Sequence, residues 1–272
     1  GDEGAAVVDR RRVAGGRDGG ESLGLGRSVS VCLPEWSPGG QLHWCDDADG
    51  WWHLRAASSP GLPSRGSGDD LDLAVLGGGE VGEEVGEPRW VAGGHRYAFC
   101  GDGRLVLAVS SGGIDSVWLL DPTTGQRCAP PGPRFSSVEY VAALDDHVVI
   151  VGADATRPSS VWLLDLAAEP DHDDAAVDLR PVDAPLDPGW VSVPTAITFG
   201  TGPSALSDHV PAGDPAHGDA AHALLYLPVS GDHEAPAGEV PPLVVRIHGG
   251  PTAAARPEFS PSVQFWTTRG FA

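Results

Sequence analysis

The sequence predicts two fold classes in series: an all-β region built from repeated sheets, then the beginning of an α/β domain. Three observations lead to this prediction. Short apolar stretches alternate with Gly- and Asp-rich turns through the first two-thirds, a five-residue pattern recurs, and a nearly all-apolar run ends in a Gly-rich loop near the C-terminus. Short strands joined by such turns are typical of antiparallel hairpins.

Three groups of strands are expected in the all-β region. The first group holds residues 41–45 and 51–55, the second 95–100, 104–109 and 116–121, and the third 137–141, 146–151 and 160–165. Each stretch combines apolar and β-branched residues with Gly, Asp or Pro turns at its ends, which is the pattern of half-buried strands.

The decisive feature is a repeat. Val-Trp-Leu-Leu-Asp occupies 117–121 and again 161–165, so Trp118 and Trp162 are 44 residues apart. A period of about 40–45 residues with four strands indicates a β-propeller blade, because neighbouring blades cover the faces that one sheet leaves exposed. Trp52 fits the same role one blade earlier, with 58–70 as an insertion. A β-sandwich with Trp in its core is the alternative; the repeat favours a partial propeller of about three blades.

The acidic, Pro- and Ala-rich stretch near 169–187 marks a change of composition. It lacks the alternating ligands and central Gly of a calcium loop, so a solvated linker or long blade connection is the better interpretation. The expected domains are therefore a partial propeller over 1–190 and the start of an α/β domain over 191–272.

The C-terminal region has a different order of elements. Residues 195–199 and 221–227 are predicted strands around a loop over 200–219, and 243–247 is apolar enough to be a strand buried on both faces of a parallel sheet. Ser260 and Pro261 then resemble the N-cap and first residue of a short helix. Its expected apolar face holds Val263, Phe265 and Trp266, Gly270 ends it, and 271–272 begins another strand.

The run 243–247 ends in His248-Gly249-Gly250-Pro251, which fits an α/β-hydrolase oxyanion loop. That chemistry needs a backbone N–H aimed at the oxygen that becomes negative during attack on a carbonyl, and Gly leaves room for the approach. Pro251 is expected to restrict Gly250 to extended conformations. A plain turn at the end of a strand is the alternative for these residues.

Residues 241–252, followed by 264–272, resemble the start of the catalytic domain in the prolyl oligopeptidase family of serine peptidases, closest to its acylaminoacyl-peptidase and dipeptidyl-aminopeptidase-like branch. Pro34-Glu35-Trp36-Ser37-Pro38-Gly39-Gly40 with Trp51-Trp52 is similar to a propeller blade of that branch, although Gly39 replaces the usual Asp. Residues 87–90 and 96–99 resemble the following blade. The resemblance covers about 29–272.

The resemblance implies a propeller that screens substrates by size above an α/β-hydrolase domain that cleaves peptides or blocked amino-terminal residues through a Ser-Asp-His triad. It places the oxyanion N–H on Gly250, with Gly249 and His248 supporting the loop. In the family the triad follows this loop, so it lies outside the sequence, and the chain alone is expected to be inactive. A carboxylesterase, or a propeller interaction module with a degenerate hydrolase remnant, are the alternatives.

The composition of the chain excludes some classes of binding partner. The 17 basic residues are all Arg, and against 38 acidic residues they leave a net charge of −21, which disfavours nucleic acid and anionic membrane surfaces. No apolar run is long enough to span a membrane, and the first residues lack a signal-peptide pattern. The absence of Met indicates that the sequence starts inside a longer one. A peptide is the expected partner, and the sequence leaves a homo-oligomer open.

The other residues that could form a catalytic or metal site show no pattern that supports such a role. Cys32, Cys45, Cys100 and Cys128 have no zinc-ligand spacing, so they are interpreted as buried thiols in a reducing, cytoplasmic compartment. Ser22 matches G-x-S-x-G but lacks the preceding strand and following helix of a nucleophile elbow. The other nine histidines form no metal-binding pair; they are His43, His53, His95, His147, His172, His209, His217, His222 and His233. No metal or organic cofactor is expected.

Overall fold

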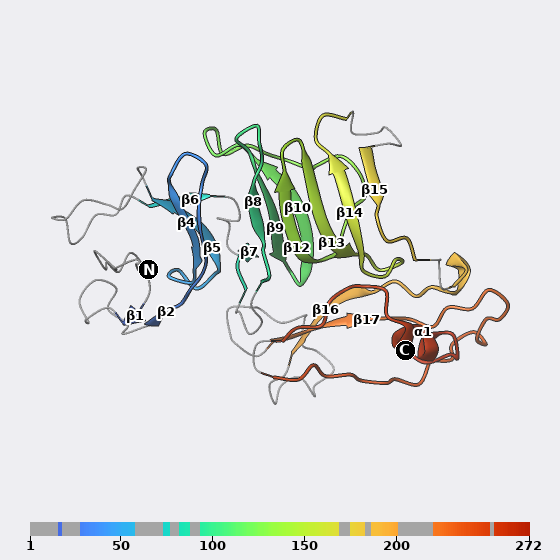
Figure 1. Ribbon diagram of the computed structural model, residues 1–272. Helices are drawn as coiled ribbons and strands as arrows, with labels where there is room; N and C mark the ends of the chain where they lie inside the picture. Colours follow the sequence, from blue (N-terminus) through green and yellow to red (C-terminus); the bar gives the residue numbers. More distant parts are fainter. Residues whose placement is uncertain are drawn as a thin grey trace, which may run out of the picture. The chain divides into compact units, whose positions relative to one another are not determined.

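The computed structural model describes residues 16–17, 28–57, 73–76, 82–87, 93–168, 175–182, 186–200, 220–250 and 253–272. By compactness the chain divides into two units, Gly1–Gly93 and Gly94–Ala272. The structure is mostly antiparallel sheet, as the sequence predicts for its first two-thirds (Figure 1). The domain boundary predicted near residue 190 stays a prediction.

The first unit contains a four-stranded sheet in which consecutive strands are neighbours. Its strands are β3 (Val31–Trp36), β4 (Leu42–Asp46), β5 (His53–Ala57) and β6 (Leu73–Leu76). The short strands β1 (Gly16–Arg17) and β2 (Ser28–Val29) form a separate pair, and β7 (Glu83–Glu84) follows later in the chain. The predicted insertion 58–70 lies outside the described residues, in the connection from β5 to β6.

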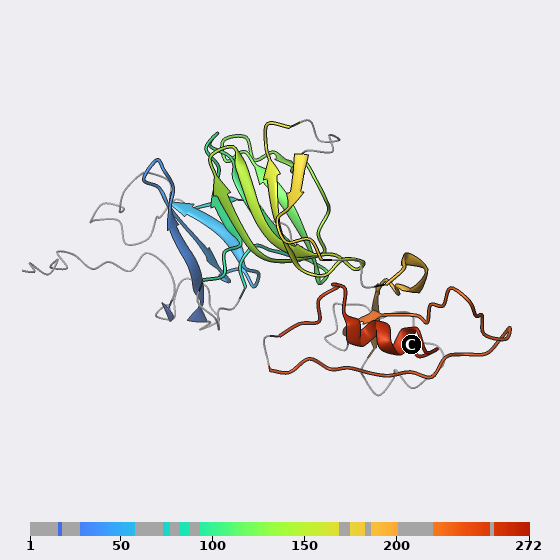
Figure 2. The ribbon, with the colours of Figure 1, turned by 45° about the vertical axis from the view of Figure 1, so that its right-hand side comes forward.

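The second unit begins with two more sheets of the same kind. The strands β8 (Tyr97–Phe99), β9 (Leu105–Ser111), β10 (Ile114–Leu120) and β11 (Arg127–Cys128) form one antiparallel sheet. The strands β12 (Ser137–Leu144), β13 (His147–Ala153), β14 (Ser160–Asp165) and β15 (Ala176–Asp178) form the next. Figure 2 shows these two sheets side by side. The strand β15 lies within the acidic stretch 169–187.

One apolar cluster joins these two sheets. Val117 and Leu119 of β10 lie opposite Ala108 and Val106 of β9, so all four point to one face. The second sheet contributes Val138, Val141, Val148, Ile150 and Leu164 to the same cluster. A register shift between Val138 and Tyr140 lets Val138 and Val141, three residues apart, both face the core. The two sheets therefore pack face to face.

The Trp repeat coincides with the third strand of each of these sheets. Trp118 lies in β10 and Trp162 in β14, and both are half-buried. Trp162 packs edge-on against Phe135, with ring centroids 6.1 Å apart. Trp52, by contrast, lies just before β5, so it does not occupy the strand position of the other two.

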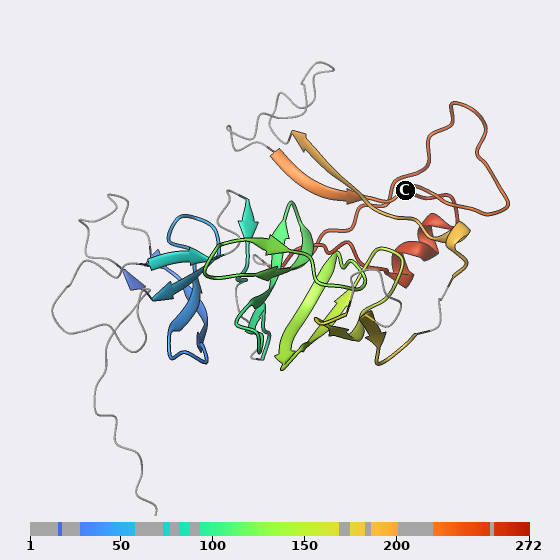
Figure 3. The ribbon, with the colours of Figure 1, turned by 90° about the horizontal axis from the view of Figure 1, so that it is seen from above.

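The rest of the second unit contains little regular structure. The one-turn 3₁₀ helix η2 (Pro188–Trp190) precedes an antiparallel hairpin of β16 (Thr195–Gly200) and β17 (Ala220–Leu225), which confirms the two strands predicted there. This hairpin is a curved ribbon in Figure 3. The α-helix α1 (Pro261–Thr267) follows at the predicted position.

Candidate active-site loop and its anchor

The residues predicted to form the oxyanion loop lie in an exposed turn. His248, Gly249 and Gly250 are all exposed, and the space where a Cβ would stand on either Gly is open among the described residues. Gly250 has a φ of +75°, in the left-handed region that favours Gly, whereas the sequence predicts an extended conformation. Pro251 lies outside the described residues. The roles of His248, Gly249 and Gly250 stay predictions.

The apolar run before this turn is not a buried strand, which corrects the sequence prediction. Residues 243–247 are irregular and exposed, and Ile247 keeps 87% of its surface accessible. The physical reason is that the described residues cover neither face of the run. Its backbone is nevertheless paired at one point, because Ala272 donates to the Pro242 carbonyl at 2.9 Å and accepts from the Val244 N–H at 2.7 Å.

Ala272 thus bonds to the residues on either side of Leu243, which is the hydrogen-bond pattern of a parallel pair. Parallel neighbours need a crossover connection, and α1 lies within the chain that joins the two positions. The local order is therefore an extended segment, a Gly-rich turn, a helix, and a second extended segment beside the first. The sequence predicts the same order of segments, but with strands at 243–247 and 271–272, and neither segment is a regular strand in the structure.

Helix α1 begins as predicted, but the residues that it buries are polar. Ser260 is its extended N-cap residue, with no capping bond from its side chain, and Pro261 is the first helical residue. The buried helix residues are Gln264 and Thr267, whereas Phe265 and Trp266 are 49% and 40% exposed. Of the predicted apolar face, Val263 is half-buried, whereas Phe265 and Trp266 are uncovered among the described residues.

Hydrogen bonds explain why the polar side of α1 is buried. The Gln264 side chain accepts from the Ser192 N–H at 2.8 Å and donates to the Ser192 carbonyl at 3.0 Å. The Ser192 hydroxyl donates to the Leu227 carbonyl at 2.6 Å. Both polar groups of the buried Gln264 amide are thus satisfied, which fixes the helix against the segments on either side of the β16–β17 hairpin.

The segment before α1 is attached to the sheet of β8–β11 and to the sheet of β12–β15. The Ser136 hydroxyl donates to the Pro257 carbonyl at 2.5 Å, and the Ser137 hydroxyl donates to the Glu258 carboxylate at 3.2 Å. The N–H of Phe259 donates to the Asp154 carbonyl at 2.8 Å. We call residues 256–259 the docking segment.

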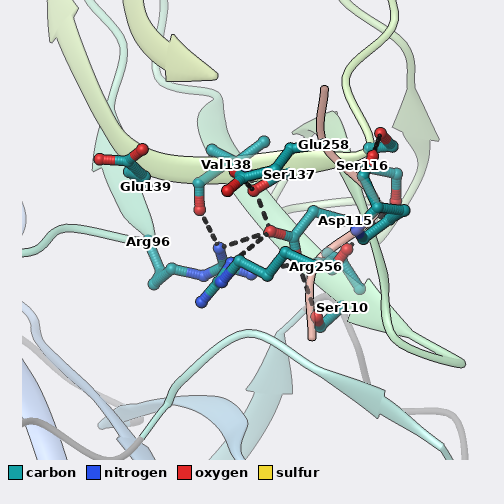
Figure 4. A network of polar contacts seen from close by, with 12 residues as sticks. Arg96, Ser110, Asp115, Ser116, Ser137, Val138, Glu139, Arg256 and Glu258 are labelled. Atoms are coloured by element: carbon teal, nitrogen blue, oxygen red, sulfur yellow. Dashed lines mark hydrogen bonds and ion pairs between the residues drawn. The ribbon is translucent and has the colours of Figure 1, made fainter. Parts of the chain in front are cut away.

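The fourth contact of the docking segment is an ion pair with a buried carboxylate, drawn in Figure 4. Arg256 donates to Asp115 at 3.0 Å, and Arg96 donates to both oxygens of the same carboxylate at 3.0 and 3.2 Å. Ser110 and the Val138 N–H add bonds of 2.6 and 2.8 Å. Asp115 and Arg96 are each only 3% exposed.

The cluster keeps Asp115 ionised. Burial alone raises the pKa of this carboxyl, but the charge of Arg96 and the bonds from Arg96, Ser110 and Val138 outweigh it and hold the pKa below its ordinary value. Arg96 also donates to the Val138 carbonyl at 2.6 Å, so the guanidinium joins the two sheets. The cluster can bind and hold a charged side chain, which is the function it serves for Arg256.

Sequence reasoning missed this cluster. Asp115 follows Gly112-Gly113-Ile114 in a hairpin, where an acidic residue is normally a turn residue on the surface. Arg256 is 141 residues away from it in the sequence. The only available signal was a charged residue within the apolar pattern of β10, and that signal names no partner.

The remaining candidates have mixed outcomes. Cys32, Cys45 and Cys100 are buried thiols as predicted, but Cys128 is exposed because it lies in the short outer strand β11. Ser22 lies outside the described residues. Within the ranges that are described, no group of His, Cys, Asp or Glu could hold a metal ion, and no helix could cross a membrane.

Solved structures of peptidases resemble this chain. A puromycin-hydrolysing peptidase from Mycobacterium tuberculosis is 26% identical with a TM-score of 0.72, over 90% of this chain and 34% of its own length. A puromycin hydrolase is 27% identical with a TM-score of 0.68, over 89% and 32%. A prolyl endopeptidase shares the fold at 12% identity and a TM-score of 0.56, over 90% and 31%.

These neighbours confirm the resemblance to prolyl oligopeptidase-like peptidases, and this chain spans about a third of their length. No protein-family model matches the sequence, and no curated protein does. The similarity of fold extends across both units, since it covers nine-tenths of the chain.

Proposed function

We propose that this chain is part of a serine peptidase of the prolyl oligopeptidase type, and that it comprises propeller blades followed by the first part of the α/β-hydrolase domain. The antiparallel sheets that contain β3–β6, β8–β11 and β12–β15 are the blades, and the catalytic domain begins after residue 190. The Ser-Asp-His triad is contributed by sequence beyond these residues, so the chain alone does not hydrolyse substrate.

The observation that supports this proposal most is the parallel pairing of Leu243 with Ala272 around a Gly-rich turn and a helix. A doubly wound domain places its ligand at the carboxyl ends of its parallel strands. The turn at 248–250 directly follows the first of these two extended segments. It is therefore where an oxyanion donor of such a domain belongs.

The exposed apolar residues fit the same proposal. Leu243, Val245 and Ile247 are exposed on the run before the turn, and Phe265 and Trp266 on α1. Large exposed apolar patches indicate an interaction surface. We assign their cover to further strands of the same domain, since the peptidases that the chain resembles are about three times as long.

In this mechanism Gly250 binds the anion that forms when the nucleophile attacks the substrate carbonyl. Its backbone N–H donates to the tetrahedral oxygen, and such a donor contributes about 2.7–4 kcal/mol to lowering the barrier. The missing side chain and the φ of +75° both permit this role. Acyl transfer of this kind needs only a nucleophile, a base and fixed dipoles.

The experiment uses the full-length protein with aminoacyl amides of aminomethylcoumarin, with puromycin, and with p-nitrophenyl esters of the same acyl groups. Puromycin is included because two structural neighbours hydrolyse it. Amide turnover together with covalent labelling by a fluorophosphonate supports the peptidase. Ester turnover without amide turnover indicates a carboxylesterase, and neither activity nor labelling indicates an interaction module.

A further inference from the structure

We propose that Asp115 and Arg256 are positioning residues for the oxyanion loop: the sheets hold the chain just beyond Gly250 through a buried carboxylate, and so fix where the Gly250 N–H points. This inference rests on the proposed function, because it concerns the same loop. It adds a role for the sheets in the catalytic step itself, beyond the screening of substrates by size.

The first support is the density of bonds on the docking segment. Four consecutive residues, 256–259, each make a hydrogen bond to the two sheets, two through the backbone and two through side chains. Phe259 is also buried, with 6% of its surface exposed. A segment held at every residue cannot shift as a unit without breaking several bonds together.

The second support is the short distance along the chain. Arg256 is six residues beyond Gly250, and six residues span at most about 21 Å when fully extended. On its other side the loop is fixed at Val244 by the pairing with Ala272. The turn at 248–250 therefore lies between two anchored points, and loss of either one widens the range of positions open to the Gly250 N–H.

The third support is the division of roles within the cluster. Arg96 already contacts both Asp115 oxygens and is as buried as Asp115, so these two residues form a preorganised acceptor. The Arg256 side chain is 35% exposed. It enters the cluster from the docking segment, and its removal leaves the buried pair of Arg96 and Asp115 in place. Arg256 can thus be tested with little damage to the sheets.

The test is made in the full-length enzyme with Arg256→Gln, Arg256→Lys and the matched control Arg104→Gln. Arg104 is similarly exposed and pairs with Asp102, but it lies in a turn with no bond to the docking segment. We expect Arg256→Gln to lower kcat by about 10- to 100-fold with KM changed less than about threefold, since a small misplacement of reacting groups has effects of this size. Arg256→Lys should recover part of kcat, and Arg104→Gln should retain it.

A peptide boronic acid separates positioning from a structural role, because its tetrahedral adduct places an oxygen where the oxyanion forms. Its affinity should fall in parallel with kcat in Arg256→Gln, while the affinity for a non-covalent product peptide stays unchanged. Wild-type kcat in a folded Arg256→Gln variant, or a loss of kcat with unchanged boronate affinity, overturns the inference.

Two further results of the experiment are possible: a variant that does not fold and a wild-type protein without activity. If Arg256→Gln does not fold, Ser136→Ala removes a different bond to the docking segment and must lower kcat by at least about threefold; unchanged kcat then overturns the inference. If the wild-type protein neither hydrolyses amides nor reacts with the fluorophosphonate, the proposed function fails first. That result is distinct from an active enzyme that is indifferent to Arg256.

Discussion

Replacing Asp115 by Asn should destabilise the fold strongly, although the two side chains have almost the same shape. The Asp115 carboxylate accepts two bonds from Arg96, one from Ser110 and one from the Val138 N–H, in a site with 3% exposure. The Asn amide carries no charge and turns an NH₂ group toward some of these donors. The buried Arg96 then loses the negative charge that Asp115 places against it at 3.0 Å.

The expected loss is about 3–5 kcal/mol in the free energy of unfolding, the typical effect of removing one partner from a buried ion pair. The double variant Arg96→Met with Asp115→Leu should lose less, about 1–3 kcal/mol, because the buried charge pair is removed as a whole. The remaining loss comes from neutral groups of Val138 and Ser110 that bonded to the pair. Urea denaturation followed by Trp fluorescence measures both values in the 272-residue chain.

The matched control is Asp102→Asn, because Asp102 and Arg104 form an exposed pair with 40% and 32% side-chain exposure. We expect less than about 1 kcal/mol there. A loss below about 1 kcal/mol for Asp115→Asn, or a double variant at least as destabilised as the single one, would refute the reasoning that burial of the charge determines the effect.

Three other predictions concern the free energy of unfolding. Gly132→Ala should lower it by about 2–4 kcal/mol and Gly125→Ala by only about 1–2 kcal/mol. Both glycines have positive φ, but a Cβ at Gly132 would lie 2.6 Å from the Cβ of Ala176, whereas the space at Gly125 is open. Equal losses for the two variants in urea denaturation would contradict the clash. Ile150→Ala should cost about 2–5 kcal/mol because Ile150 is fully buried between the sheets, measured by the same assay, and a loss under about 1 kcal/mol would place it outside the core. The pKa of Asp115 is lower in the folded state than in the unfolded state. The stability that this carboxylate contributes is therefore complete above the unfolded pKa of about 3.9 and is lost as pH falls through the folded pKa. Asp115→Asn should flatten the fall of the unfolding free energy at acid pH, and an unchanged fall would exclude this carboxyl as its source.

The sheets could be predicted from the sequence because their information is local. Apolar alternation and Gly- or Asp-rich turns depend on neighbouring residues only, and the recurrence of Val-Trp-Leu-Leu-Asp marks the third strand of two sheets. Trp52 shows the limit of this reasoning. Its composition matched the pattern, but strand β5 begins one residue after it, and element boundaries depend on pairing partners that the local sequence does not specify.

The anchor of the loop could not be predicted, because it depends on contacts across long stretches of sequence. Asp115, Arg96 and Arg256 come from a hairpin, a strand entry and an irregular segment, and no local pattern links them. A turn Asp and a buried ion-pair Asp have the same local sequence. Only the packing of the two sheets, which buries Asp115 at their junction, distinguishes the two.

The orientation of α1 gives the proposed domain a physical argument independent of sequence identity. Apolar spacing predicts that Phe265 and Trp266 are buried, whereas the described structure buries Gln264 instead. The two results agree if α1 packs on both sides: the Gln264 amide is satisfied by Ser192 on one side, and the aromatic rings meet the proposed additional strands on the other. In a doubly wound domain each helix packs its apolar stripe against the sheet, and this is the place that the aromatic side of α1 would take. The exposed aromatics on α1 and the exposed aliphatics on 243–247 thus fit the additional strands that we propose beside the turn that carries Gly250.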